Sequence, residues 1–443
     1  SLRLIGLIAL SCVAITARGQ ESTANGPLDY RIELTTVHSG YDRLTCFVHA
    51  RAAAIPGNPP SVVITTHPIR ISGTDVFYAV HDIRTDNGGK TWSSPTKHAD
   101  SLGRRKLENG LEEAFINPSP KWHAKTGVVL CIGDCVVYRN DALDPHPRPV
   151  RPGYTVYDPK TRTWTPWKRM KVPLPMFHDS YCGSDQRIDL ANGDILLPAG
   201  CCLPGTAGYL GNDQSQQAGV VMHCTFDGKT MRYVKHGAEL TMREGGGYTE
   251  PSATKFKGKY YLTLRSNKSG YVTTGEDGLN YNKPIPWTFD DGSNLGNYKT
   301  QQHWVTHSDG LFLAYTRRGA NNNHIFRHRA PLFIAQVNPQ RLHVIRSTER
   351  VLVPQRGARV GNFGVVDISP NETWVTAAEW MQTKAPHWFD PTICEKHGSD
   401  NRIFVAKIKW NRPNKLAQAD GEDHYTEAAA QDKRREERRS RRR

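Results

Sequence analysis

The stretch "TDNGGKTW", residues 85–92, has the layout of a tight turn between two β-strands. The side chain of Asn87 can accept hydrogen bonds from backbone N–H groups, the glycine pair tolerates the positive φ that such turns require, and the closing tryptophan packs beneath them. Looser copies of this layout are "TGEDGLNY" (274–281), "TFDGKTM" (225–231) and "YDPKTRTW" (157–164). Four such turns along one chain predict a small β-sheet that is repeated.

The segments between these turns read as short strands. Runs such as "SVVITTH", "GVVLCIGDCVVY" and "NRIFVAKIKW" are apolar or alternating and are bounded by Gly, Pro, Asn or Asp, while helical periodicity is almost absent before residue 415. This pattern extends over residues 30–412, which is too long for a single sandwich. The sequence therefore predicts an all-β fold, a six-bladed β-propeller with seven blades as the alternative.

The two ends differ from the body of the chain. Residues 1–20, "SLRLIGLIALSCVAITARGQ", combine a positive end, a short apolar core and small residues, which is typical of a secretory signal peptide. The chain carries a net charge of +15, and residues 413–443 end in a run of basic side chains. We expect that tail to be solvated and disordered rather than a nucleic-acid arm. The sequence thus predicts a secreted or periplasmic monomer without a membrane span.

Nine cysteines are present, and eight remain once Cys12 is removed with the signal peptide. In an exported protein these are candidates for disulfides. The apolar strand context of Cys131 and Cys135 instead indicates a structural role for that pair. No spacing resembles a zinc site, and we expect neither a metal nor a cofactor.

The turn layout resembles the Asp-box, or BNR repeat, of the sialidase (neuraminidase) superfamily. Segments such as "YTEPSATKFKGKYYLTLRS" and "RGARVGNFGVVDISPNETWVTAAEW" are similar to secreted sialidase-like propellers, and the likeness covers residues 40–410. The resemblance implies an exo-acting glycoside hydrolase that releases an acidic sugar. In this family a glutamate activates a tyrosine nucleophile, arginines hold the sugar carboxylate, and an aspartate acts as the general acid.

Carried over by position, the resemblance makes Glu250 the activating acid, Arg265 a clamp arginine and Asp75 the general acid. Arg51 is the best substitute for the first clamp arginine, although this chain has Ala-Ile-Pro where the family has Arg-Ile-Pro. His178 is a further candidate acid or base.

One departure concerns the nucleophile. Where the family delivers its tyrosine, this chain reads "GNFGVV" with Phe363. Tyr248, Tyr261 or Tyr315 would have to substitute, and we assign Tyr261.

The stretch "YTRRGANNNHIFRHRAPLF", residues 315–333, holds four arginines and two histidines and no acid. Because the guanidinium fork matches carboxylate geometry, this stretch predicts an anion site for an acidic sugar. The residues expected to bind substrate are Arg51, Arg187, Arg265, Gln302, His303, Arg318, Asn322, His328 and Arg329.

Two alternatives stay open. The many histidines and the missing terminal tyrosine favour a propeller polysaccharide lyase that acts on uronic-acid glycans by β-elimination with a His or Tyr base. A non-catalytic carbohydrate-binding propeller is the third interpretation. In each case the partner is an acidic oligosaccharide or polysaccharide.

Overall fold

The computed structural model describes residues 28–73, 75–143, 150–203, 217–242 and 246–417. The predicted signal peptide lies outside these residues, as does most of the predicted tail. Within the described residues the α-helices are short: α1 (Ala99–Leu102) and α2 (Pro391–Lys396). The 3-10 turns are η1 (Glu108–Gly110), η3 (Phe326–His328) and η4 (Arg346–Thr348). All other regular structure described is strand, which confirms the all-β prediction.

Among the described residues the strands pair into six sheets, each of which is antiparallel and built mostly from consecutive segments. The first contains β2 (Thr45–Ile55), β3 (Ser61–Arg70), β4 (His81–Thr85) and β5 (Thr96–Lys97). The second contains β6 (Arg105–Lys106), β7 (Leu111–His123), β8 (Val128–Arg139), β9 (Ala142–Leu143), β10 (Arg151–Asp158), β11 (Thr163–Trp164) and β12 (Lys168–Arg169). The third contains β13 (Ser180–Tyr181), β14 (Ile188–Asp189), β15 (Ile195–Cys202), β16 (Gln217–Phe226), β17 (Met231–His236) and β18 (Leu240–Thr241).

The fourth sheet contains β19 (Thr249–Phe256), β20 (Lys259–Arg265), β21 (Gly270–Gly275) and β22 (Ile285–Pro286). The fifth contains β23 (His303–His307), β24 (Gly310–Tyr315), β25 (Leu332–Asn338), β26 (His343–Val344) and β27 (Arg350–Val353). The sixth contains β28 (Arg359–Val360), β29 (Gly364–Ser369), β30 (Glu372–Trp380), β31 (Ile403–Trp410) and β1 (Tyr30–His38).

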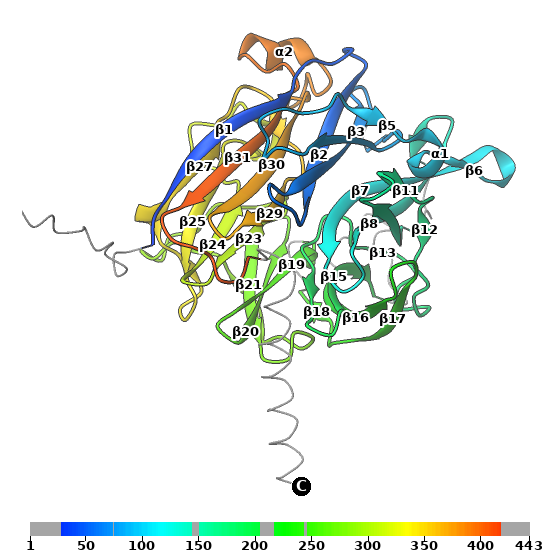
Figure 1. The fold of residues 1–443 in the computed structure, drawn as a ribbon. Helices are drawn as coiled ribbons and strands as arrows, with labels where there is room; N and C mark the ends of the chain where they lie inside the picture. The colour runs from blue at the N-terminus through cyan, green and yellow to red at the C-terminus, as the bar shows by residue number, and fades with distance from the viewer. Residues whose placement is uncertain (1–27, 74, 144–149, 204–216, 243–245, 418–443) are drawn as a thin grey trace, which may run out of the picture.

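The sheets are arranged around a common middle. Figure 1 shows β2, β7, β19, β23 and β29 gathered there, and neighbouring members of this set contact one another. We call β2, β7, β13 with β14, β19, β23, and β28 with β29 the inner strands. In five sheets the inner strands stand at one end of the strand order, and in the second sheet β7 is flanked by the short β6.

The two ends of the described chain meet in the sixth sheet. β1 pairs antiparallel with β31, so that Tyr30 lies opposite Trp410. The first strand of the chain therefore completes the last sheet.

The four turns found in the sequence occupy equivalent places, between the third and fourth strands of four sheets. In the first, Asn87 Oδ1 accepts the N–H groups of Lys90 and Thr91 at 3.1 and 3.0 Å. Asp158, Asp227 and Asp277 each accept the N–H two residues further on. Asn338 does the same in the fifth sheet, at 3.1 Å, in a turn that the sequence pattern did not reveal. A side-chain acceptor thus closes the outer hairpin of five sheets.

Apolar side chains fill the space between neighbouring sheets, and Trp167, Trp287, Trp304 and Trp374 are fully buried there. Seven cysteines belong to this interior as free thiols: Cys46, Cys131, Cys135, Cys182, Cys201, Cys224 and Cys394. The expected disulfides are therefore wrong for these seven, because each thiol is packed as a small apolar group.

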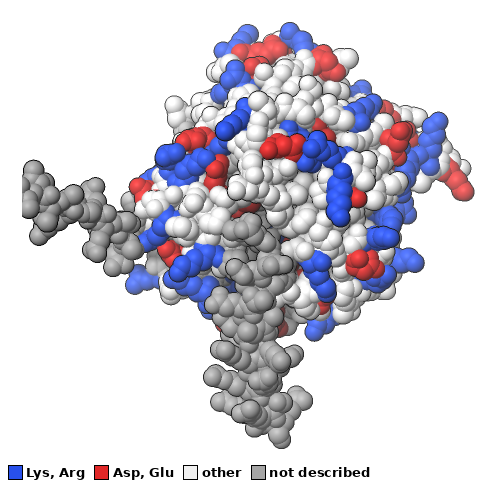
Figure 2. All heavy atoms as spheres, viewed as in Figure 1, with Lys and Arg blue, Asp and Glu red and all other residues white. Residues whose placement is uncertain are grey.

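The surface is mixed in charge, since Lys and Arg are interspersed with Asp and Glu over the face in Figure 2. Among the described helices, none is long and apolar enough to cross a membrane. Asn414, in the first part of the predicted tail, is buried and donates to Thr306 O at 2.9 Å.

Candidate functional site

Five of the six inner positions share an irregularity at one level, and β23 pairs regularly with β24. β2, β7 and β19 shift register next to His49, Asn117 and Glu250, and these residues have φ of 56°, 53° and 41°. At the corresponding level β13 and β14 are separated, as are β28 and β29. A bulge turns a side chain away from the regular alternation of a strand. The polar residues at these breaks can therefore face the middle of the ring together.

Glu250 and Arg265 form an ion pair at this level. Arg265 Nη1 lies 2.6 Å from Glu250 Oε1, with 19% and 13% of the two side chains exposed. The other carboxylate oxygen, Oε2, is buried without a partner among the described residues. Burial opposes ionisation of Glu250, but the charges of Arg265, Arg329 and Arg51 outweigh it and hold the pKa below its usual value. Glu250 is thus an ionised carboxylate with one oxygen available.

Two further arginines lie beside this pair with unused donors. Arg329 and Arg359 are 3% and 4% exposed, and the Nε–H of each lacks a partner among the described residues. Arg329 Nη2 donates to Lys299 O at 2.5 Å, and Arg359 Nη2 donates to Gln382 Oε1 at 2.6 Å. The Arg359 guanidinium also stacks 3.3 Å from the ring centre of Trp380. These contacts hold both guanidinium groups in place, while the Nε–H donor of each has no hydrogen-bond acceptor among the described residues.

The loop that carries Arg329 is shaped by the asparagines before it. Asn322 is fully buried, and its Nδ2 donates to Arg317 O at 2.9 Å and to Ala330 O at 2.7 Å. Arg327 has a φ of 55° within the same loop. The asparagine fixes the backbone, and the arginines are presented from it.

The arginines repel one another. Burial, followed by the charges of Arg327, Arg265 and Arg359, holds the pKa of Arg329 well below its ordinary value. Burial and Arg327 lower the pKa of Arg359 to about 9. Such a cluster, opposed by few acids, is an environment that an anion would stabilise.

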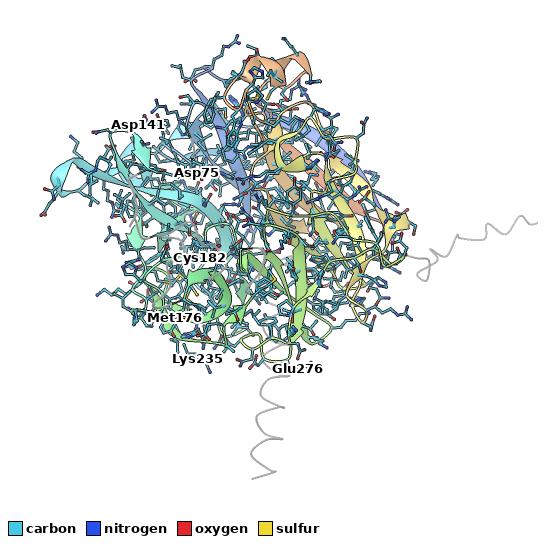
Figure 3. The ribbon with its side chains drawn as sticks, turned by 180° about the vertical axis from the view of Figure 1, so that it is seen from behind. Asp75, Asp141, Met176, Cys182, Lys235 and Glu276 are labelled. Atoms are coloured by element: carbon cyan, nitrogen blue, oxygen red, sulfur yellow. The ribbon has the colours of Figure 1, made fainter. Side chains whose placement is uncertain are left out.

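Asp75 faces the same cluster. Burial lowers the pKa of both Arg327 and Arg359, and the charge of Asp75 offsets part of this lowering. Its own φ is 54°. The Tyr138 hydroxyl donates to Asp75 O at 2.7 Å, which fixes the backbone there. Figure 3 shows the position of Asp75 relative to Cys182, which lies near the middle of the molecule. The structure therefore brings together Asp75, Glu250, Arg265, Arg327, Arg329 and Arg359, which we call the arginine mouth.

Arg51 lies deeper, and its donors are used. Its Nη1 donates to the carbonyl oxygens of Asn117, Pro118 and Gly183 at 3.0, 3.2 and 2.9 Å. Its Nε donates to Phe363 O at 3.4 Å. The guanidinium thus links four inner-strand segments across the middle of the ring, which corrects its expected role as a clamp that is free for a carboxylate.

Several expected site residues lie elsewhere. Tyr261 packs in an apolar cluster, and its hydroxyl donates to Pro339 O at 3.3 Å. Arg187 pairs with Asp189 at 2.9 Å. Gln302 accepts the Thr263 hydroxyl at 3.0 Å, and His178 is exposed on a different loop. Tyr261, Arg187 and Gln302 thus make structural contacts, and His178 faces solvent.

The two remaining tyrosines proposed as substitutes are also engaged. The Tyr315 hydroxyl donates to Glu349 at 2.6 Å, and that carboxylate also pairs with Arg317. Tyr248 packs against Tyr271 with ring centres 5.1 Å apart.

The last three candidates are His303, which is buried, and His328 and Arg318, which both contact Tyr298. His303 is buried with Nδ1 2.9 Å from Ser252 Oγ, and burial lowers its pKa to about 3. His328 Nδ1 lies 2.6 Å from the Tyr298 hydroxyl, and Arg318 stacks over the same tyrosine ring at 4.2 Å.

Sequence reasoning missed Arg359 and Tyr181, and it found Arg327 only as one of the four arginines of residues 315–333. Tyr181 lies on β13, where burial raises its pKa well above the ordinary value, with the charge of Glu250 adding to this and that of Arg265 opposing it. Its hydroxyl donates to Gln217 Oε1 at 3.4 Å. No local motif marks these residues, since only the ring arrangement places them beside Glu250. Among the described residues no group of three or more His, Cys, Asp and Glu side chains could hold a metal ion.

Comparisons with known proteins support the fold. No family model matches the sequence, and no curated protein matches it. A solved protein of unknown function from Dyadobacter fermentans aligns with a TM-score of 0.57 and 14% identity over 85% of this chain and 99% of its own. Trypanosoma rangeli sialidase in complex with the inhibitor DANA aligns with a TM-score of 0.55 and 11% identity, over 82% of this chain and 55% of its own.

The phage phi92 endosialidase aligns with a TM-score of 0.53 and 11% identity over 88% of this chain and 71% of its own. At these identities the likeness concerns the fold alone. The chain has the β-propeller arrangement of these sialidases, and the number of blades stays a prediction.

Proposed function

We propose that the protein is an exo-acting glycoside hydrolase of sialidase type, which releases an acidic sugar at the arginine mouth. The observation that carries this proposal is the Glu250–Arg265 pair at 2.6 Å beside buried arginines with unused Nε–H donors. Arginine forks bind carboxylates by two parallel hydrogen bonds, so Arg265, Arg329 and Arg359 are suited to hold the acidic group of the sugar. In this proposal they take the place that the sequence had given to Arg51.

The chemistry would be shared between Glu250, Tyr181 and Asp75. The Tyr181 phenol attacks the anomeric carbon while its proton passes to the Glu250 carboxylate, and Asp75 protonates the departing glycosidic oxygen. Water then attacks the anomeric carbon and gives its proton to the Asp75 carboxylate, the sugar–tyrosine bond breaks, and Glu250 returns its proton to the departing phenolate. A neutral phenol is the suitable nucleophile because a carboxylate there would repel the acidic substrate.

The test is a product assay with the purified protein. Incubation with sialosides and with uronic-acid glycans is expected to release a free acidic sugar without a new ultraviolet absorbance. Tyr181→Phe and Glu250→Gln should abolish the release, while Glu276→Gln, which alters an exposed glutamate, should not. Turnover that survives in both site variants would contradict the proposal.

A polysaccharide lyase is the second candidate, favoured by the Tyr298–His328 contact of 2.6 Å. The arginines would neutralise a uronate carboxylate, and the Tyr298 oxygen, after giving its proton to His328, would take the C5 proton. The bond from C4 to the leaving oxygen would then break, and His328 would pass its proton to that oxygen. The product carries a carbon–carbon double bond, so a new absorbance that is lost in Tyr298→Phe identifies this route. Binding without either product would identify a carbohydrate-binding propeller.

We also propose that the six sheets correspond to six blades, and that the protein is an exported monomer. Sedimentation of the mature protein and detection outside the cytoplasm would test the last two points.

A further inference from the structure

A cavity opens at the opposite end of the inner strands from the arginine mouth. It has a volume of about 590 Å³ and is lined by residues near the ends of β2, β7, β14, β19, β23 and β29. We call this opening the rear mouth. Arg51 lines its inner end, and the hydrogen bonds of that guanidinium to Asn117 O and Gly183 O close the ring there. The two mouths are therefore separate compartments of one central channel.

The cavity exists because small side chains face it. Ala52 and Ala54 on β2 and Ala253 on β19 line its wall, together with the apolar side chains of Leu197 and Val365. These aliphatic side chains form part of the wall, next to polar ones such as Gln186, His303 and Thr306. A volume of this size accommodates a molecule of one or two sugar rings.

Asp185 is a polar side chain without a partner at the inner end. It is 7% exposed, it lines the cavity, and both of its carboxyl oxygens lack a hydrogen-bond partner among the described residues. Buried polar groups are normally hydrogen-bonded, so an unpartnered one that faces a cavity indicates a ligand group or water. Burial, with the nearby charges of Asp134 and Glu250, holds the pKa of Asp185 well above its ordinary value. As a neutral acid it can donate one hydrogen bond and accept another.

The rim has an excess of positive charge. Lys121, Lys255 and Lys257 line it, and Lys121 lies 3.3 Å from Asp189. Lys255 and Lys257 have no carboxylate partner among the described residues and instead lie over aromatic rings at 5.1 and 5.2 Å.

The acids of the rear mouth do not offset this excess. Asp189 is already shared with Arg187, at 2.9 Å. Asp367 accepts the Thr373 hydroxyl at 2.6 Å, and burial raises its pKa to about 6. An anionic group is therefore favoured at the rim.

We propose that the rear mouth is a second binding site, for a small polyhydroxy carboxylate such as an acidic monosaccharide or disaccharide. The carboxylate lies between Lys255 and Lys257 at the rim, and a hydroxyl at the other end of the molecule bonds to Asp185. This site does not depend on the activity proposed for the arginine mouth.

The experiment is calorimetric titration with glucuronate, in a protein whose arginine mouth is disabled by Arg329→Ala. One binding event is expected to remain, and glucose at the same concentration should give none. Hexanoate serves as a carboxylate without hydroxyls. Tighter binding of hexanoate than of glucuronate would overturn the polyhydroxy assignment, and absence of any glucuronate binding would overturn the site.

Variants locate the ligand within the cavity. In the same background, Lys255→Ala with Lys257→Ala should weaken glucuronate binding at least tenfold. The matched pair Lys229→Ala with Lys259→Ala removes the same charge outside the cavity lining and should leave binding unchanged. Equal weakening by both pairs would show a general charge effect and contradict the site.

Asp185 is probed by two substitutions. Asp185→Asn keeps a donor and an acceptor and should retain binding, while Asp185→Val removes both and should lose it. Should Asp185→Val fail to fold, the lysine pair still decides the outcome. Unchanged binding in a folded Asp185→Val protein would remove the aspartate from the proposal.

Discussion

The two mouths of the channel both carry excess positive charge, but they hold it differently. At the arginine mouth, Arg329 and Arg359 are buried and their Nε–H donors are unused. At the rear mouth both buried arginines are engaged: Arg51 bonds to backbone carbonyl groups, and Arg187 donates to Leu130 O at 2.7 Å and pairs with Asp189 at 2.9 Å. The positive charges of the rear mouth that have no carboxylate partner among the described residues are those of Lys255 and Lys257, which are more exposed to solvent than Arg187.

Because of this difference, we expect the arginine mouth to require one ligand geometry and the rear mouth to accept several. A buried guanidinium with unmade hydrogen bonds costs stability unless a ligand completes it, so its presence favours a site shaped for one anion geometry. A lysine is a flexible point charge that accepts many geometries at little cost. We therefore expect chemistry and strict recognition at the arginine mouth, and weaker binding of broader range at the rear mouth.

The largest expected effect is on turnover. Glu250→Gln should reduce kcat by roughly 10²–10⁴-fold, because it removes the proton acceptor of the proposed reaction. Glucuronate binding at the rear mouth should stay within twofold of the unmodified protein, measured by calorimetry in the Arg329→Ala background. Equal losses in both measurements would mean that the two mouths are not separate.

The next effect concerns the group that divides the mouths. Arg51→Met leaves the carbonyl groups of Asn117, Pro118 and Gly183 without their donor, and we expect it to lower the free energy of unfolding by about 3 kcal/mol. Urea denaturation followed by tryptophan fluorescence measures this change. Arg162→Met, an exposed arginine, should cost less than about 0.5 kcal/mol. A small effect for Arg51→Met would show that the ring closes without it.

A smaller effect tests arginine against lysine directly. Arg359→Lys keeps the charge but loses the fork and the stacking on Trp380, so KM for the acidic substrate should rise about tenfold. Lys255→Arg at the rear mouth should change glucuronate affinity less than threefold, since no fixed geometry is required there. The reverse ranking would contradict the distinction between the two mouths.

The smallest effect is the pH dependence of stability. Because the folded pKa of Asp185 is raised, its protonation stabilises the fold at low pH, and this contribution is lost as pH rises above 3.8 toward the folded pKa. Asp185→Asn should therefore increase the free energy of unfolding by about 1 kcal/mol at neutral pH and by less at pH 4.

Glu250 has the opposite sign. Its folded pKa is depressed, so its contribution is present above the unfolded value of 4.5 and is lost as pH falls through the folded pKa. In Glu250→Gln the protein should therefore lose stability relative to the unmodified protein at neutral pH, and this difference should shrink in acid. Denaturation curves at several pH values distinguish the two carboxyls, and the same sign for both would contradict these assignments.

The sequence predicted what depends on local chemistry. The turn around Asn87 and its relatives could be found because side-chain acceptors and glycines close a hairpin within a few residues. Glu250 and Arg265 were found through a resemblance carried by one short segment. Both are local signals.

The other residues of the site come together only because the sheets are arranged in a ring. Arg327, Arg359 and Tyr181 are brought near Glu250 only by sheets that are distant in the sequence, and no short pattern encodes that approach. Arg187 and Gln302 were misassigned for the same reason. Each lies directly before an inner strand, and the sequence alone does not distinguish a polar residue that binds a ligand from one that bonds to a neighbouring part of the chain. The bulge at Glu250, with its positive φ, also breaks the alternation on which strand patterns rely.

The pairing of β1 with β31 has a consequence for how the molecule is made. Five sheets consist of contiguous segments and can form while translation proceeds, but the sixth needs Tyr30 opposite Trp410. Its completion must wait until β31 has left the ribosome, and until then β1 has an open edge that can pair with other chains. Protection of that edge by a chaperone is therefore a step to look for during biosynthesis.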